Sequence, residues 1–130
     1  MKIRIRAVLA VAVAFLMGSG PLLAHHAFAW ADNEHPINLS GTVVEFWYAN
    51  PHSQIMLDVK GKDGEVEHWM IEIGPPAALR RAGWNSATIK QGDQITVTGG
   101  AAKDGRKILN ITGKLMVNGH ELSTRDPNVS

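Results

Sequence analysis

Two short runs near the middle of the chain alternate between apolar and polar residues, and they constrain the fold more than any other feature. In SQIMLDV (53–59) and in VEHWMIEI (66–73), every second residue is apolar over most of the run. A period of two places these side chains on one face of a β-strand. The Gly/Asp-rich segment between the runs, KGKDGE, predicts a turn. Together they predict an antiparallel β-hairpin.

The register of this hairpin follows from keeping its apolar faces together. Pairing Leu57 with Trp69 sets Met56 opposite Met70, on a face directed away from the core. We interpret this face as the candidate ligand or partner surface; its predicted residues are Gln54, Met56, His68, Met70 and Glu72. The two methionines have three alternative roles. They could form a soft surface that tolerates Cu(I), an apolar patch for a ligand or partner chain, or a surface beneath the N-terminal arm.

The remaining elements predict a small barrel. A strand follows Leu39, with a bulge near Val44 and Glu45, and GPPAALRRAGW predicts a short helix that Gly83 ends. QITVTGG predicts a fourth strand, and RKILNITGKLMV a fifth strand that Gly113 breaks. Asn-Gly after this strand predicts a hairpin. The order β-β-β-α-β-β is that of an all-β, five-stranded OB-like barrel with one short helix, although another five-stranded roll is an alternative. An OB barrel binds its ligands on strands 2 and 3.

The N-terminus has the pattern of a secretory signal peptide. MKIRIR carries three basic residues, and an apolar run that is shorter than a membrane span ends at Gly and Pro residues. We predict that residues 1–24 are a cleaved signal peptide and that the protein is periplasmic, without a stable membrane anchor. Cleavage after Ala29 is the alternative to cleavage after Ala24. We further predict an N-terminal arm (25–38), a barrel domain (39–122) and a polar tail (123–130).

Charge and composition narrow the function classes. Cleavage after Ala24 removes three of the 13 basic residues and none of the 12 acidic ones, which changes the formal charge from +1 to −2. From this charge and the lack of a basic face we predict no nucleic-acid partner. The chain has no cysteine, so disulfides and thiolate metal sites are excluded. The sequence carries no serine elbow, phosphate loop or His-Glu-x-x-His motif, and we therefore predict a non-enzymatic protein.

Several motifs resemble those of one family of small exported bacterial proteins, which is known only as a domain of unknown function. They are AHHAF, which spans the predicted cleavage site, GTV leading to NPH, the RRAGW segment, and GDQITVTG followed by AKDG. Ala27 and Tyr48 stand where this family more often has serine and tryptophan. The resemblance covers nearly the whole mature chain. It implies export and a small β-barrel, and it implies no activity.

Three histidines form the candidate metal site. If cleavage exposes His25, its α-amine and ring nitrogen could chelate a metal, and His26 and the distant His52 could complete a nitrogen set suited to Cu(II). Alternatively, His25 and His26 are polar arm residues, and His52 is a turn residue in NPH. The sequence thus leaves three functions. They are a non-enzymatic barrel that binds a small ligand or a periplasmic protein, a copper-handling protein, and a copper-dependent oxidase.

Overall fold

The computed structural model describes residues 28–128. The strands are β1 (Ile37–Trp47), β2 (Gln54–Lys60), β3 (Val66–Glu72), β4 (Gln94–Ala101), β5 (Ile108–Val117) and β6 (His120–Glu121), and the helix α2 (Pro76–Arg81) separates β3 from β4. Over residues 28–128, no helix has the length and apolar character that crossing a bilayer requires.

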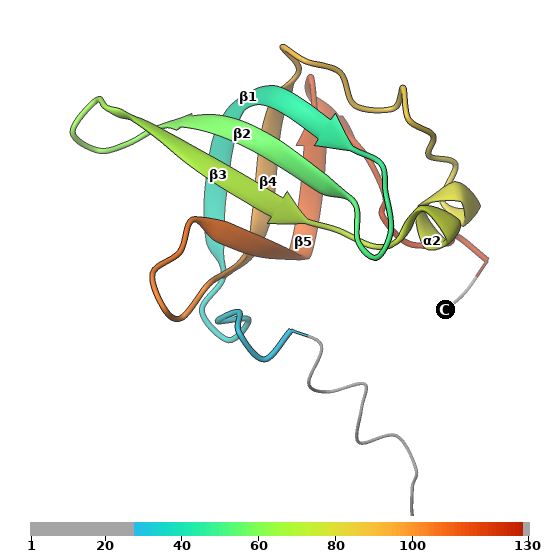
Figure 1. Ribbon diagram of the computed structural model, residues 1–130, viewed down its shortest axis with the longest axis horizontal. Helices are drawn as coiled ribbons and strands as arrows, with labels where there is room; N and C mark the ends of the chain where they lie inside the picture. Colours follow the sequence, from blue (N-terminus) through green and yellow to red (C-terminus); the bar gives the residue numbers. More distant parts are fainter. Residues whose placement is uncertain (1–27, 129–130) are drawn as a thin grey trace, which may run out of the picture.

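The strands close into a barrel. Their order is β3-β2-β1-β4-β5, every one of these neighbouring pairs is antiparallel, and a parallel pairing of β3 with β5 joins the two ends. Figure 1 shows the long β1 curving from one side of the barrel across to the other, with α2 at one end. This confirms the predicted β-β-β-α-β-β OB-like barrel with one short helix. Closure also leaves few unpaired strand edges.

A bulge in β1 fixes which of its side chains face outward. Val43 pairs with Leu57 and Glu45 pairs with Met56, so Val44 is the extra residue between two consecutive positions of β2. The bulge lies where the sequence predicted it. It keeps Val43 and Phe46 on the inner side and turns Glu45 outward, because one inserted residue reverses the alternation of the strand.

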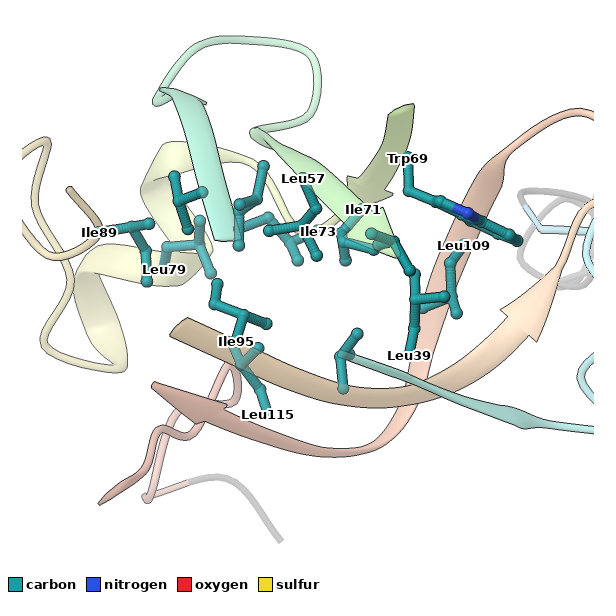
Figure 2. Packing of buried hydrophobic residues seen from close by; sticks show 14 of the residues in the cluster. Leu39, Leu57, Trp69, Ile71, Ile73, Leu79, Ile89, Ile95, Leu109 and Leu115 are labelled. Atoms are coloured by element: carbon teal, nitrogen blue, oxygen red, sulfur yellow. The ribbon is translucent and has the colours of Figure 1, made fainter. Parts of the chain in front are cut away.

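The inner faces of the strands form one continuous hydrophobic core. Figure 2 shows it extending from Leu79 and Ile89 near α2 to Trp69 and Leu109 at the other end of the barrel. Ile55, Ile71, Leu79 and Leu109 are completely buried. Burying one such side chain contributes about 1.5–3 kcal/mol. The alternating residues of both hairpin strands supply much of this core, as their pattern predicted.

The helix α2 begins and ends at the predicted signals. Pro76 occupies its first position, where a missing N–H costs nothing. Gly83, just beyond its end, adopts a φ of 88°. Leu79 anchors the helix in the core, and the Tyr48 hydroxyl donates to the Pro76 carbonyl oxygen at 3.0 Å. Tyr48 also packs against Phe46, with 5.8 Å between ring centroids, so its ring lies against the hydrophobic core.

Gly113 does not break β5, which is a correction to the sequence analysis. The strand continues through it, although the pairing with β4 is irregular there, with Val97 opposite Leu115 and Gly99 opposite Ile111. A Cβ on Gly113 would lie 2.9 Å from Thr98 Cβ. The glycine therefore serves the close approach of two strands. After β5, the predicted Asn118-Gly119 turn returns the chain as β6.

Candidate functional site

The outer face of β2 and β3 has the predicted register. Met56 lies opposite Met70, Gln54 opposite Glu72, and Asp58 opposite His68. Both methionines are half-buried, whereas their neighbours Ile55 and Ile71 are completely buried on the inner side. The methionine pair thus occupies the middle of a face whose polar residues lie on both sides of it along the strands.

The neighbouring strands widen this face with residues that the sequence analysis did not assign to it. The bulge in β1 sets Glu45 beside Met56 and Trp47 beside Gln54, and the Trp47 side chain is 50% exposed. On the other side, β5 sets Ile108 beside Met70 and Asn110 beside Glu72. Trp47 lies between Phe46 and Tyr48, two residues that share a face, and this alternation was a usable sequence signal that Trp47 points outward. No such signal predicted the pairing of β3 with β5, because it joins segments that are far apart in the chain.

From here on, the outer face denotes these residues of β1, β2, β3 and β5. They are Glu45, Trp47, Gln54, Met56, Asp58, His68, Met70, Glu72, Ile108 and Asn110.

The described part of the N-terminal arm is attached to the loop between β4 and β5. Ala31 pairs with Ala102, the Asp32 N–H donates to the Ala101 carbonyl, and the Lys103 N–H donates to the Trp30 carbonyl. Ala31 is only 3% exposed. Figure 1 shows this segment beneath the β4–β5 loop. The arm is therefore held at the border of the outer face by backbone hydrogen bonds.

The arm also contacts the loop between β1 and β2. The rings of Phe28 and His52 lie 6.0 Å apart, centroid to centroid, at an interplanar angle of 31°. His52 also contacts Glu72, since its Nδ1 lies 2.7 Å from a carboxylate oxygen of that residue. The predicted site residues His52 and Glu72 are thus brought together, with Phe28 beside them.

A second histidine–carboxylate pair lies on the other side of the two methionines. His68 Nδ1 lies 2.7 Å from Asp58 Oδ1. In both pairs the carboxylate engages Nδ1, which fixes the orientation of the ring and directs Nε2 away from the carboxylate. The pairs differ in burial, because the side chain of His52 is 37% exposed and that of His68 is 79% exposed.

The metal site predicted from three histidines is described only in part. His25 and His26 lie outside the described residues, and His52 is the one member that the structure describes. Within residues 28–128, no three side chains of His, Asp or Glu gather into a metal-binding set. The structure therefore leaves the site at His25, His26 and His52 as a prediction.

A charged cluster lies at the start of β3, on the same side of the strand as the buried Trp69. The indole N–H of Trp69 donates to Glu67 at 2.8 Å, and Lys107 Nζ lies 3.1 Å from the same carboxylate. These interactions, the indole hydrogen bond first, hold the pKa of Glu67 below its ordinary value. Lys107 Nζ also lies 5.1 Å from the ring centroid of Trp69. The cluster ties β3 to the end of the β4–β5 loop.

Comparison with known proteins assigns the chain to a family. The family of unknown function DUF6152 matches residues 13–110. The chain belongs to this family. The finding agrees with the resemblance in the sequence motifs, and the family carries no assigned activity. None of the curated proteins matches the DUF6152 chain.

Among solved structures, the crystal structure of the mitochondrial single-stranded DNA-binding protein Rim1 from S. cerevisiae is similar to this DUF6152 protein. The two chains are 12% identical, with a TM-score of 0.49, and the match covers 66% of this chain and 95% of Rim1.

This comparison corrects the predicted absence of a nucleic-acid partner, which was wrong as a firm exclusion. The prediction rested on a formal charge of −2 for the mature chain, whereas a single-stranded DNA-binding protein is now found among the similar structures. The physical reason is that net charge does not decide binding to single strands. Stacking of bases on aromatic side chains contributes together with a local basic groove.

Proposed function

We propose that this DUF6152 protein is an exported, non-enzymatic binding module that holds its ligand on the outer face. The observation that carries the proposal is the composition of this face. Met56, Met70 and Ile108 form a half-buried apolar centre, and Gln54, Glu72 and Asp58 surround it with polar groups. An apolar surface with a few polar groups at its rim is the usual chemistry of a ligand site.

The position of the face in the barrel supports the same function. OB barrels bind ligands on strands 2 and 3, between the β1–β2 loop and the β4–β5 loop. Here the first loop contributes His52, and the second holds the arm that brings Phe28 to His52. The arm thus bridges the two loops that flank the outer face, and an aromatic ring stands at its border.

The location of the ligand can be tested without knowing its identity. A ¹⁵N-labelled protein is titrated with periplasmic extract and, separately, with the same extract after dialysis. We expect the amide signals of Gln54, Met56, Met70 and Glu72 to shift or broaden. Loss of the effect on dialysis would indicate a small molecule, and its retention a macromolecular partner.

The matched variant for this titration carries Met56→Ser and Met70→Ser, and the response should be lost in it. The competing site is the open cleft near the β2–β3 turn, which Lys60, Lys62 and Lys107 line. Changes confined to this cleft, or an unchanged response in the double variant, would refute the proposal.

The proposal that the protein is exported rests on the N-terminal sequence pattern. We propose that residues 1–24 are removed and that the protein acts in the periplasm. The protein is expressed with its own N-terminus, purified from the periplasm, and its intact mass is recorded. A mass equal to residues 25–130 is expected. A mass beginning at Trp30, or the full 130-residue chain, would contradict this cleavage site.

A second candidate function is copper handling, with His25, His26 and His52 as ligands. The contact between Phe28 and His52 favours it. His25 precedes Phe28 by three residues, and three residues span about 10–11 Å at most. A chain of this length is sufficient for His25 to reach His52, provided that cleavage leaves His25 in the chain.

The intact-mass experiment also tests this candidate. Under native conditions, copper handling predicts one added copper per chain, and a variant with His25→Ala and His26→Ala should bind no Cu(II). A matched control is His120→Ala, which changes an exposed histidine at β6. A double variant that retains one tightly bound Cu(II) would exclude the histidine site.

A further inference from the structure

We propose that Met56, Met70 and His68 form a binding site for a soft monovalent metal ion, Cu(I), on the outer face, with Asp58 orienting the histidine. This inference rests on the proposed function, since it names the ligand class of the same face. It does not depend on His25 or His26. It concerns thioether ligands and Cu(I), whereas the N-terminal histidines offer a nitrogen site suited to Cu(II).

The two sulfur ligands come from the register of β2 and β3. Met56 and Met70 are direct cross-strand partners on the outer face. Directly opposed residues of antiparallel strands have Cβ atoms about 4.5–5.5 Å apart. Each methionine side chain has three rotatable bonds, so both thioethers can turn toward one ion between them. The chain has no cysteine, and methionine is therefore its only soft ligand.

His68 supplies the third ligand from the same strand as Met70. It lies two positions from Met70 and diagonal to Met56, because its own partner is Asp58. Diagonal positions are about 7–8 Å apart, within reach of long side chains. The Asp58 carboxylate holds His68 Nδ1 at 2.7 Å, which directs Nε2 away from Asp58. A carboxylate behind a histidine is the common arrangement at metal sites.

The surroundings of the three ligands favour a cation. Glu45 lies directly beside Met56, and Trp47 is the next outward residue of β1, diagonal to Met56. A carboxylate attracts the positive ion, and an exposed indole face contributes a cation–π interaction. These residues enter the face only because of the bulge at Val44. The bulge thus adds one charge and one aromatic ring to the two methionines.

The test uses the mature protein carrying His25→Ala and His26→Ala, so that the N-terminal nitrogen ligands are absent. Cu(I) is titrated anaerobically in competition with a chromogenic Cu(I) chelator, and Ag(I) serves as a redox-inert second probe. We expect one ion per chain and a change in tryptophan fluorescence from Trp47. Met56→Leu, Met70→Leu and His68→Gln should each weaken binding at least tenfold, and Asp58→Asn by about 10–100-fold.

Met116→Leu is the matched control, because Met116 lies on β5 opposite Glu121, away from the outer face. Exchange of methionine for leucine preserves volume, and it costs less than about 1.5 kcal/mol even in a core. The variants should therefore stay folded, which their urea unfolding curves verify. Binding as tight in the Met56→Leu, Met70→Leu double variant as in the parent would overturn the inference, as would failure to bind Cu(I) and Ag(I).

The failure of this inference and that of the proposed function give different results. If Cu(I) does not bind but the extract still shifts the Met56 and Met70 amides, the outer face binds a different class of ligand. If Cu(I) binds equally well to all variants of the face while the extract leaves these amides unchanged, both proposals are wrong.

Discussion

Two hydroxyl groups that point inward, those of Tyr48 and Ser53, differ in whether they are hydrogen-bonded. The Tyr48 hydroxyl donates to the Pro76 carbonyl at 3.0 Å and lies 3.3 Å from the Trp84 carbonyl. It thus links the end of β1 to both ends of the α2 segment. We expect Tyr48→Phe to lower the free energy of unfolding by about 1 kcal/mol, the usual net value of one hydrogen bond. Urea denaturation measures this, and an unchanged midpoint would contradict it.

For the Ser53 hydroxyl we expect the opposite effect, because its removal should raise the free energy of unfolding. Ser53 is completely buried, and within residues 28–128 its Oγ has no hydrogen-bond partner. Its backbone is already paired, with the N–H donating to Gly74 and the carbonyl accepting from Ile73. A buried hydroxyl without a partner costs about 1–3 kcal/mol in lost hydration. Ser53→Ala should therefore raise the free energy of unfolding, by about 1 kcal/mol after the loss of some packing. A lower midpoint in urea would show that the hydroxyl does bind a partner.

At the scale of elements, local sequence patterns were sufficient to predict most of the strands of the barrel and its helix. The alternation in β2 and β3 set the register that places Met56 opposite Met70, because a slip of one residue would expose the whole core face. Proline and glycine marked both ends of α2. Gly113 misled the sequence analysis, since a glycine is required both where a strand breaks and where two strands approach closely.

The attachment of the arm could not be predicted, because it joins two irregular segments and leaves no periodic pattern. Its main enabling residue is Gly100, where an added Cβ would lie 2.7 Å from the Asp32 backbone and 2.5 Å from Asn33 Oδ1. The absence of a side chain at Gly100 is thus what allows the arm to lie against β4. The position of Phe28 beside His52, at the border of the outer face, was not predicted for the same reason.

We expect Gly100→Ala to release the arm while leaving the barrel folded. The Asp32 and Lys103 amides donate hydrogen bonds between the arm and the loop. In the variant they should exchange their hydrogens at least tenfold faster, which corresponds to a loss of about 1.4 kcal/mol of local stability. Gly74→Ala is the matched control, because its Cβ would make an ordinary contact of 3.8 Å with Ala78. Unchanged exchange at Asp32 in Gly100→Ala would show that the arm is held by other contacts.

For the whole molecule, the described carboxylates with shifted pKa values all shift in the same direction. Hydrogen bonds to His35, Trp69, Asn118 and Arg106 lower the pKa values of Asp32, Glu67, Asp93 and Asp104, respectively. A lowered pKa means that the unfolded chain binds more protons than the folded protein as the pH falls from the ordinary pKa of the group toward its lowered pKa. The contribution of each group to the free energy of unfolding is therefore complete above the ordinary carboxylate pKa and is lost at lower pH. These groups are largely exposed, so each contributes little.

The resulting prediction is a urea midpoint that stays flat from neutral pH to about pH 5 and falls below about pH 4.5. Glu67→Gln should make this fall shallower, because glutamine still accepts from the Trp69 indole but does not titrate. Lys107→Gln should retain most of the fall, since the indole hydrogen bond lowers the pKa of Glu67 more than the lysine does. If both variants follow the parent curve between pH 3 and 5, the acid dependence comes from other carboxylates. If Lys107→Gln has the larger effect, the ion pair to Lys107 dominates the pKa of Glu67, and the cation holds the start of β3 to the β4–β5 loop.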